Sequence, residues 1–202
     1  MPRYPLKTAE ASCKVLASKF LVLACPLASS ADFPALYASV KAAYPGADHY
    51  PYAYQVGTMA KASEDGEPSG AAARAYLSLI SRKDLDHIAL IAVRYFGGSK
   101  LGLPRLKRTF LETAEAAVAS LTLGEPFTQQ RVGLSLSFHD YDVLQKNAER
   151  LGIYLLPGKF GTNVELEVRG DATIFTALRD LGISQEAMKD LGLIMSVKEI
   201  KL

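Results

Sequence analysis

Six consecutive apolar residues, Ile88 to Val93 (IALIAV), constrain the fold of this chain more than any other stretch. The run has the length of a strand, and a strand without alternating polar residues is buried on both of its faces. The chain must therefore build a sheet that is covered on both sides. Its 202 residues, 49% of them hydrophobic and 22% charged, suffice for two compact globular domains.

The segments around this run indicate alternating strands and helices. Phe20 to Cys25 (FLVLAC) is interpreted as a buried first strand. Asp32 suits an N-cap and Pro34 a first helical turn, so an amphipathic helix is expected up to Tyr44. Three further elements are predicted in this half: a strand in HYPYAYQVG, which Pro51 would place at a sheet edge or a bulge, a helix from Ala71 to Ile80, and a long helix from near Pro104.

The C-terminal part of the chain has a clear element order. Residues 123–130 (LGEPFTQQ) are polar and contain Gly and Pro, which is typical of a domain junction. Beyond them we expect a strand from Val132 to Phe138, a helix capped by Asp140, a hairpin around residues 161–163, a helix capped by Asp171, and a closing strand from about Leu193 to Ile200. This β-α-β-β-α-β order is typical of the ferredoxin-like fold. We therefore predict an α+β protein with two domains, residues 1–124 and residues 128–202.

Composition and charge exclude several classes of protein. The formal net charge is only +2, so bulk charge gives no preference for nucleic acid. Cys13 and Cys25 have no CxxC or paired Cys/His spacing, so neither a zinc site nor a disulfide framework is expected, and no cofactor is predicted. The LVLAC segment resembles a lipobox, but Lys19 interrupts the apolar run that a signal peptide needs. No apolar run reaches membrane-spanning length, so we expect a cytoplasmic protein with no membrane partner.

A glycine-rich basic segment, RYFGGSKLGLPRLKR, follows the buried run and leads into the long helix. It contains no acid, and its basic residues are Arg94, Lys100, Arg105, Lys107 and Arg108. Gly97, Gly98 and Gly102 allow close approach of the backbone to a ligand, and a helix N-terminus favours anions, commonly phosphate. Tyr95 and Phe96 are suited to stacking on bases. The alternative is a tight strand-to-helix turn with solvated basic side chains.

An acidic segment, SEDGEPSG, lies ahead of the first of these helices. Glu64, Asp65 and Glu67 are candidates for a hard cation or for acid–base chemistry, but the EF-hand pattern is absent. The structural interpretation is favoured: a turn at residues 65–66, followed by a helix begun by Pro68 and capped by Ser69 or Asp65. Ser69 has His49 as a conceivable base, but no G-x-S-x-G elbow surrounds it.

Three ordered segments, HYPYAY, EDGEPSGAAAR and VRYFGGSKLG…LKR, closely resemble the signature motifs of the IMPACT/YigZ family. The resemblance implies an N-terminal α+β domain similar to the fourth domain of elongation factor G, with a right-handed β-α-β crossover. It also implies a C-terminal ferredoxin-like domain similar to the fifth domain of that factor. For bacterial members it suggests association with nucleic acid or the ribosome, whereas eukaryotic relatives regulate translation through an additional domain that is absent here.

The resemblance places a ligand-binding surface on the motif residues. They are His49, Glu64, Asp65, Gly66, Glu67, Pro68, Ser69, Gly70, Arg74, Arg94, Tyr95, Gly97, Gly98, Lys100, Gly102 and Arg108, to which the basic segment adds Arg105 and Lys107. Several positions depart from the family pattern. Pro51 stands where cysteine is common, which excludes thiol chemistry there. Ala71 and Ala73 replace Thr and Gly, and Pro104-Arg105 replaces a Gly-Gly pair.

The acidic and basic segments each join a loop to a helix on one sheet, so we expect them to meet. Asp65 or Glu67 is predicted to pair with Arg94 or Lys100, which makes the acids organisers of a composite surface. The favoured function is a non-enzymatic module that binds RNA or the ribosome, with a protein of the translation machinery as a further partner. Two alternatives stay open: a hydrolase that uses His49 with residues 64–69, and an adaptor that binds protein through the β face or edge strands of the C-terminal domain.

Overall fold

A computed structural model describes residues 2–199 of the chain. The chain divides into two compact units. Unit 1 comprises the chain up to Pro126 together with the stretch from Val197, and unit 2 comprises Phe127–Ser196. Within the described part, no helix is long and apolar enough to cross a membrane.

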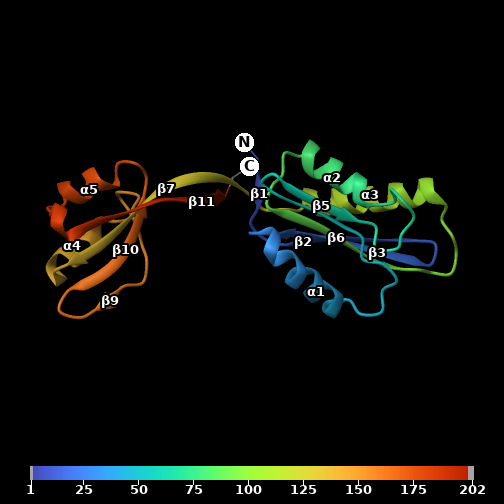
Figure 1. The fold of residues 1–202 in the computed structure, drawn as a ribbon, viewed down its shortest axis with the longest axis horizontal. Coiled ribbons are helices and arrows are strands. Elements are labelled where there is room, and N and C mark those ends of the chain that lie inside the picture. Colours follow the sequence, from blue (N-terminus) through green and yellow to red (C-terminus); the bar gives the residue numbers. More distant parts are fainter. Residues whose placement is uncertain (1, 200–202) are drawn as a thin grey trace. The chain divides into compact units, whose positions relative to one another are not determined.

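Unit 1 is a five-stranded sheet with helices on both faces (Figure 1). Its strand order is β2 (Ala9–Val15), β3 (Ser18–Pro26), β6 (Ile88–Tyr95), β4 (Tyr52–Val56) and β5 (Met59–Ser63). All neighbouring strands are antiparallel. Because β3 and β4 both run antiparallel to β6, they are parallel to each other and are joined through α1 (Phe33–Ala43). A short strand, β1 (Tyr4–Pro5), pairs instead with the start of β7 (Leu123–Leu136).

Strand β6 lies at the centre of this sheet, as the uninterrupted apolar run predicts. Every residue from Ile88 to Val93 is fully buried. On one face, Leu90 and its neighbours pack against α2 (Ala73–Arg82) and α3 (Leu103–Ala119). On the other face, Ile91 and Val93 belong to a cluster with Phe33 of α1. The two faces thus form separate apolar cores, each closed by helices.

Three strands of unit 1, β1, β2 and β5, were not predicted, and one strand was misplaced. FLVLAC is not the first strand, because β2 precedes it and forms its antiparallel hairpin partner. The alternation of half-buried and exposed residues in β2 (AEASCKV) is the signal that would have revealed it. Strand β5 covers the outer edge of β4. The prediction that Pro51 forces an edge or bulge was therefore wrong, because Pro51 precedes β4 and only its carbonyl joins the ladder, accepting from the Ala92 amide at 2.8 Å.

Helix starts also differ from the expected caps. Asp32 is the N-cap residue of α1, as expected, but its side chain makes no capping bond; it also ends a short 3-10 turn, Ser30–Asp32, which is capped by the Ser29 hydroxyl. The helix predicted from Ala71 begins at Ala73, and neither Ser69 nor Asp65 caps it. The long helix begins at Leu103, with Pro104 in its first turn, as predicted.

Unit 2 contains the expected β-α-β-β-α-β order. Its elements are β7 (Leu123–Leu136), α4 (Phe138–Asn147), β8 (Tyr154–Leu155), β9 (Lys159–Phe160), β10 (Val164–Gly170), α5 (Ile174–Asp180), a 3-10 turn (Gln185–Ala187) and β11 (Met188–Glu199). β7 pairs with β10 and β11, and β10 also pairs with β8 and β9. The second strand is thus split into two short pieces. Residues 123–130, expected to be a domain junction, contain the division between the units, which falls after Pro126, and they form the first part of β7. Ile200 lies outside the described residues.

Alternation along β7 and β10 sets the core of unit 2. Leu134 and Leu166 face a cluster that includes Leu144 of α4 and Leu178 of α5. The first helix is capped by the Ser137 hydroxyl, which accepts from the Asp140 amide at 3.1 Å, so Asp140 is not the N-cap. The carboxylate of Asp171 accepts from the Thr173 amide at 2.8 Å and so secures the turn that leads into α5, for which Thr173 is the N-cap position.

Candidate functional site

The acidic segment in unit 1 uses each carboxylate to hold backbone or side chains in place. Glu64, directly after β5, accepts from the amides of Ala72 at 2.9 Å and Ala73 at 3.2 Å. Helix α2 has no cap from its own N-cap residue, so Glu64 satisfies its first amides from the preceding loop. The Glu64 carboxylate therefore stabilises the N-terminus of α2, and these hydrogen bonds make it a poor candidate for a general acid or base.

Asp65 sits at the corner of the acidic segment with a left-handed backbone, φ +48°. Its carboxylate accepts from the Tyr50 amide at 2.7 Å, and its main-chain carbonyl lies 2.8 Å from Nδ1 of His49. Because a carbonyl can only accept, Nδ1 of His49 carries the proton in this hydrogen bond. Burial raises the pKa of the Tyr37 hydroxyl, and the nearby Asp65 carboxylate raises it further.

Glu67 and Arg94 form the ion pair that the sequence predicted between the two motifs. Nη1 of Arg94 donates to both carboxylate oxygens of Glu67, at 2.7 and 2.6 Å. Both side chains are buried, at 7% exposure for Arg94 and 1% for Glu67. The Arg94 guanidinium also lies over the rings of Phe20 and Phe96. Arg94 is therefore a buried organiser of the two loops and is not available to an external phosphate.

The glycines of the basic segment have different roles. A Cβ on Gly97 would lie 2.1 Å from the carbonyl carbon of Ala17, and the Gly97 amide donates to the Ser18 hydroxyl at 3.0 Å. Gly97 thus permits packing against the β2–β3 turn, not approach of a ligand. Gly98 and Gly102 have positive φ and open space around them. Tyr95 donates to the Pro45 carbonyl, which leaves Phe96, 43% exposed, as the ring accessible for stacking.

Five exposed basic side chains lie just before α3, in its first two turns and in the first turn of α2; we call them the basic surface. Its members are Arg74, Lys100, Arg105, Lys107 and Arg108. Arg105 and Arg108 line one hollow beside Val15, whereas Arg74 and Lys107 line another beside Ser69 and Gly70. Lys100 lines a third, described next. Arg108 donates to Glu112 at 2.8 Å, and the other four make no ion pair within residues 2–199.

A pocket of about 400 Å³ opens beside the N-terminus of α3. Its polar lining comes from Asp48, His49, Glu67, Arg94 and Lys100, and its apolar lining from Pro68, Phe96, Leu101, Leu103 and Leu106, with Gly102 at the helix start. Asp48 accepts from the Phe96 amide at 2.7 Å. The pocket therefore joins the three motifs and includes Phe96, which the sequence suggested for stacking, although Asp48 and the leucines were not singled out as site residues. In the sequence, the only indication of a role for these residues was that they lie next to the motifs.

The structure brings some predicted site residues together and separates others. His49, Glu67, Arg94, Lys100 and Gly102 line this pocket. Glu64, Ser69, Gly70, Arg74 and Lys107 line a separate hollow on the side of α2. His49 makes no hydrogen bond to a carboxylate of residues 64–69 in the described chain, where all three acids are engaged elsewhere. Residues 2–199 contain no cluster of three side chains suited to a metal.

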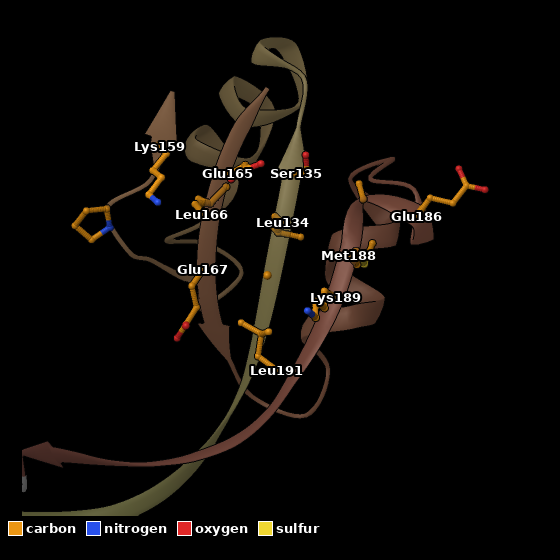
Figure 2. A pocket seen from close by; sticks show the side chains of 13 residues that line it. Leu134, Ser135, Lys159, Glu165, Leu166, Glu167, Glu186, Met188, Lys189 and Leu191 are labelled. Atoms are coloured by element: carbon orange, nitrogen blue, oxygen red, sulfur yellow. The ribbon is translucent and has the colours of Figure 1, made fainter. Parts of the chain in front are cut away.

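Unit 2 has a hollow of its own, of about 470 Å³, on its sheet (Figure 2). Figure 2 shows Ser135 of β7, Glu165 and Glu167 of β10, and Lys189 and Leu191 of β11 around it. Hydrogen bonds from Arg131 and then Arg169 lower the pKa of Glu167 to about 2. The apolar residues Leu193 and Met195 of β11 are more than 60% exposed. This face is the surface that the adaptor alternative requires.

Comparison with known proteins gives consistent matches. The model of the Impact N-terminal domain matches residues 16–118. An IMPACT family member from Thermus thermophilus is 40% identical over 101 residues, which is 50% of this chain and 55% of that protein. The Escherichia coli family member YigZ is 25% identical over 184 residues, covering 89% of this chain and 83% of YigZ. The crystal structure of a hypothetical protein, 20% identical, covers 95% of this chain and 98% of its own with a TM-score of 0.65, which shows a shared fold.

Proposed function

The chain belongs to the IMPACT family, and from that premise we propose that it is a non-enzymatic, translation-related regulator that binds the phosphate backbone of RNA, free or on the ribosome. The observation that carries the proposal is the basic surface. Four of its exposed cationic side chains lie just before α3 or in its first two turns, Arg74 lies in the first turn of α2 beside Lys107, and only Arg108 has an acidic partner within residues 2–199. Such a surface attracts a polyanion without reading its sequence.

The arrangement of the acids supports a binding role over hydrolysis. In the described chain, Glu64, Asp65 and Glu67 each accept hydrogen bonds from protein donors. A general acid or base needs a carboxylate or imidazole that can reach the reacting proton. His49 lines the pocket, and its second ring nitrogen has no hydrogen bond within residues 2–199, so the hydrolase alternative depends on His49 and not on the acidic segment.

The fold assignments implied by the resemblance are part of the proposal. The strand order β11-β7-β10-β8 in unit 2, with antiparallel β7–β10 and β10–β8 pairs, supports a ferredoxin-like domain. Similarity of the two units to the fourth and fifth domains of elongation factor G stays a prediction. The cytoplasmic location and a protein partner from the translation machinery stay predictions as well.

RNA binding over a range of salt concentrations tests the proposed function. Log affinity for single strands falls with log salt by about 0.7 per neutralised phosphate. Replacing Lys100, Arg105 and Arg108 with Gln should flatten that slope by about 2. The matched control replaces Arg3, Arg82 and Lys83, which lie near the opposite end of α3, where Arg82 pairs with Glu115. Salt-independent binding, or an equal effect of both triple variants, would rule out the basic surface.

A further inference from the structure

Strand β2 forms an edge of the unit 1 sheet, where it pairs with β3 alone among the described strands. Hydrogen bonds in an antiparallel ladder are made by alternate residues of each strand. The Ala92 amide of β6 donates to the Pro51 carbonyl, so the even-numbered residues of β6 face away from β3. Carried across β3 through the observed registers, this alternation directs the backbone groups of the odd-numbered residues of β2 into the sheet. The amides and carbonyls of Glu10, Ser12 and Lys14 therefore point outward from the free edge.

The side chains of this edge add a charge pattern to the open backbone. Cys13 packs against the core beneath α3, whereas Glu10, Ser12 and Lys14 are exposed on the opposite face of the strand. Lys14 lies directly opposite Lys19 of β3; both are exposed, and neither has an acidic partner within residues 2–199. Like charges in this position repel each other. A neighbouring strand that placed a carboxylate beside Lys14 would offset the repulsion.

A second copy of β2 supplies that carboxylate in one antiparallel register. With a two-fold axis at Ser12, Ser12 of each copy faces Ser12 of the other, and Glu10 of each copy faces Lys14 of the other. All of the outward-pointing residues then fall in hydrogen-bonded pairs, and both flanking pairs join opposite charges. A shift of one residue misaligns the backbone donors and acceptors, and a shift of two residues separates both charge pairs. The backbone and the charges thus select the same register.

Two other edge strands do not match themselves in this way. On β5, the register that aligns the outward-pointing Ala60 and Ala62 of two copies places Lys61 of one copy against Lys61 of the other. Strand β11 is interrupted at Gly192, which has φ +81° and donates its amide to the Asp190 carboxylate at 2.7 Å. Opposed charges of one sign and a break in the strand both protect a sheet edge from pairing. Strand β2 contains no proline, no glycine and no left-handed residue.

We propose that two copies of this chain associate through β2, which pairs antiparallel about Ser12 with an ion pair between Glu10 and Lys14 on either side. The pairing joins two five-stranded sheets into one continuous sheet. Because the contact is built on one strand of seven residues, the interface is small and transient. We expect a dissociation constant between about 1 μM and 1 mM, increasing with salt. The proposal does not depend on RNA binding by the basic surface.

Sedimentation velocity of the full chain over a range of protein concentrations at low salt tests the pairing. Ser12→Pro removes an outward amide and leaves the bonds between β2 and β3 intact, so the variant should fold and dimerise at least about tenfold more weakly. The matched control is Ala60→Pro, which removes an outward amide from the opposite edge and should leave the dimer unchanged. In the parent chain, hydrogen exchange at the amides of residues 10, 12 and 14 should slow as the protein concentration rises.

Exchange of the two charges tests the register without altering the backbone. Glu10→Lys and Lys14→Glu each create two pairs of like charge in the homodimer, so each variant alone should dimerise more weakly than the parent. The double variant restores both pairs, and so does an equimolar mixture of the two single variants, in which the heterodimer should form. A chain that stays monomeric up to about 1 mM, a dimer unaffected by Ser12→Pro, or single charge variants that the mixture does not rescue would overturn the proposal.

Discussion

At the residue scale, the Glu67–Arg94 pair ties the two signature motifs together. Both side chains are buried, and one guanidinium nitrogen serves both carboxylate oxygens. A buried pair contributes little net stability compared with an apolar pair of the same shape, but removing one partner strands a charge in a low-dielectric environment. The role of the pair is therefore structural. It holds the acidic segment against β6, and both side chains form part of the pocket lining.

We predict that Glu67→Gln lowers the free energy of unfolding by about 3–5 kcal/mol, because Arg94 is left charged and uncompensated. Arg94→Met should cost a similar amount, and the double variant should cost clearly less than the sum of the two. Urea titration of the four proteins measures this coupling. Glu112→Gln, which breaks the exposed Arg108–Glu112 pair, is the control and should cost about 0.5 kcal/mol or less. Additive effects of the two single changes would refute the coupling.

At the element scale, α2 depends on a loop residue for its N-terminus. Sequence reasoning placed the cap within the SEDGEPSG loop at Ser69 or Asp65, close to the helix. The observed acceptor, Glu64, lies nine residues before Ala73 and reaches it because the loop folds back. Helix caps are commonly local, so a pattern of nearby polar residues does not reveal a cap that is formed by a turn of this length.

We predict that Glu64→Ala lowers the free energy of unfolding by about 1–2 kcal/mol through loss of this cap. Glu64→Gln should cost less, because the amide oxygen can still accept from Ala72 and Ala73. The comparison is Ser69→Ala, expected within about 0.5 kcal/mol of the parent, since the Ser69 side chain has no hydrogen bond in the described chain. Chemical denaturation of the three variants measures the effect. A larger loss of stability for Ser69→Ala than for Glu64→Ala would show that Ser69, and not Glu64, caps α2.

At the scale of the whole molecule, each unit has its own apolar core. The clusters around Phe110 and Ile91 belong to unit 1, and the cluster around Leu144 belongs to unit 2. The proposed RNA surface and the pocket beside α3 are built from unit 1 alone, whereas the sheet hollow is built from unit 2. Binding and the stability of unit 2 should therefore be separable.

We predict that Leu144→Ala destabilises unit 2 by about 2–5 kcal/mol, because it empties a fully buried position. In a urea titration followed by amide NMR signals, the midpoint of unit 2 residues should fall while that of β6 residues stays unchanged. Phe110→Ala should do the reverse, at a cost of about 3–5 kcal/mol. RNA affinity in the absence of urea should be unchanged by Leu144→Ala. A single transition in which all amides shift together would show that the two cores unfold as one.

The sequence by itself determined the features that depend on local pattern. A continuous apolar run made β6 the buried central strand, alternation and turn residues gave the element order of unit 2, and the opposite charges of two loops predicted an ion pair between them. These predictions were confirmed because periodicity, turn chemistry and charge can be read from short segments of the sequence.

Only the tertiary structure decided which distant groups meet. It selected Glu67 over Asp65 as the partner of Arg94, turned Gly97 toward Ala17, and assembled Asp48, Phe96 and Leu103 into one pocket. The physical reason is that hydrogen bonding and packing between segments far apart in sequence are set by the sheet register and the loop paths, to which the residues of any one segment contribute only a part.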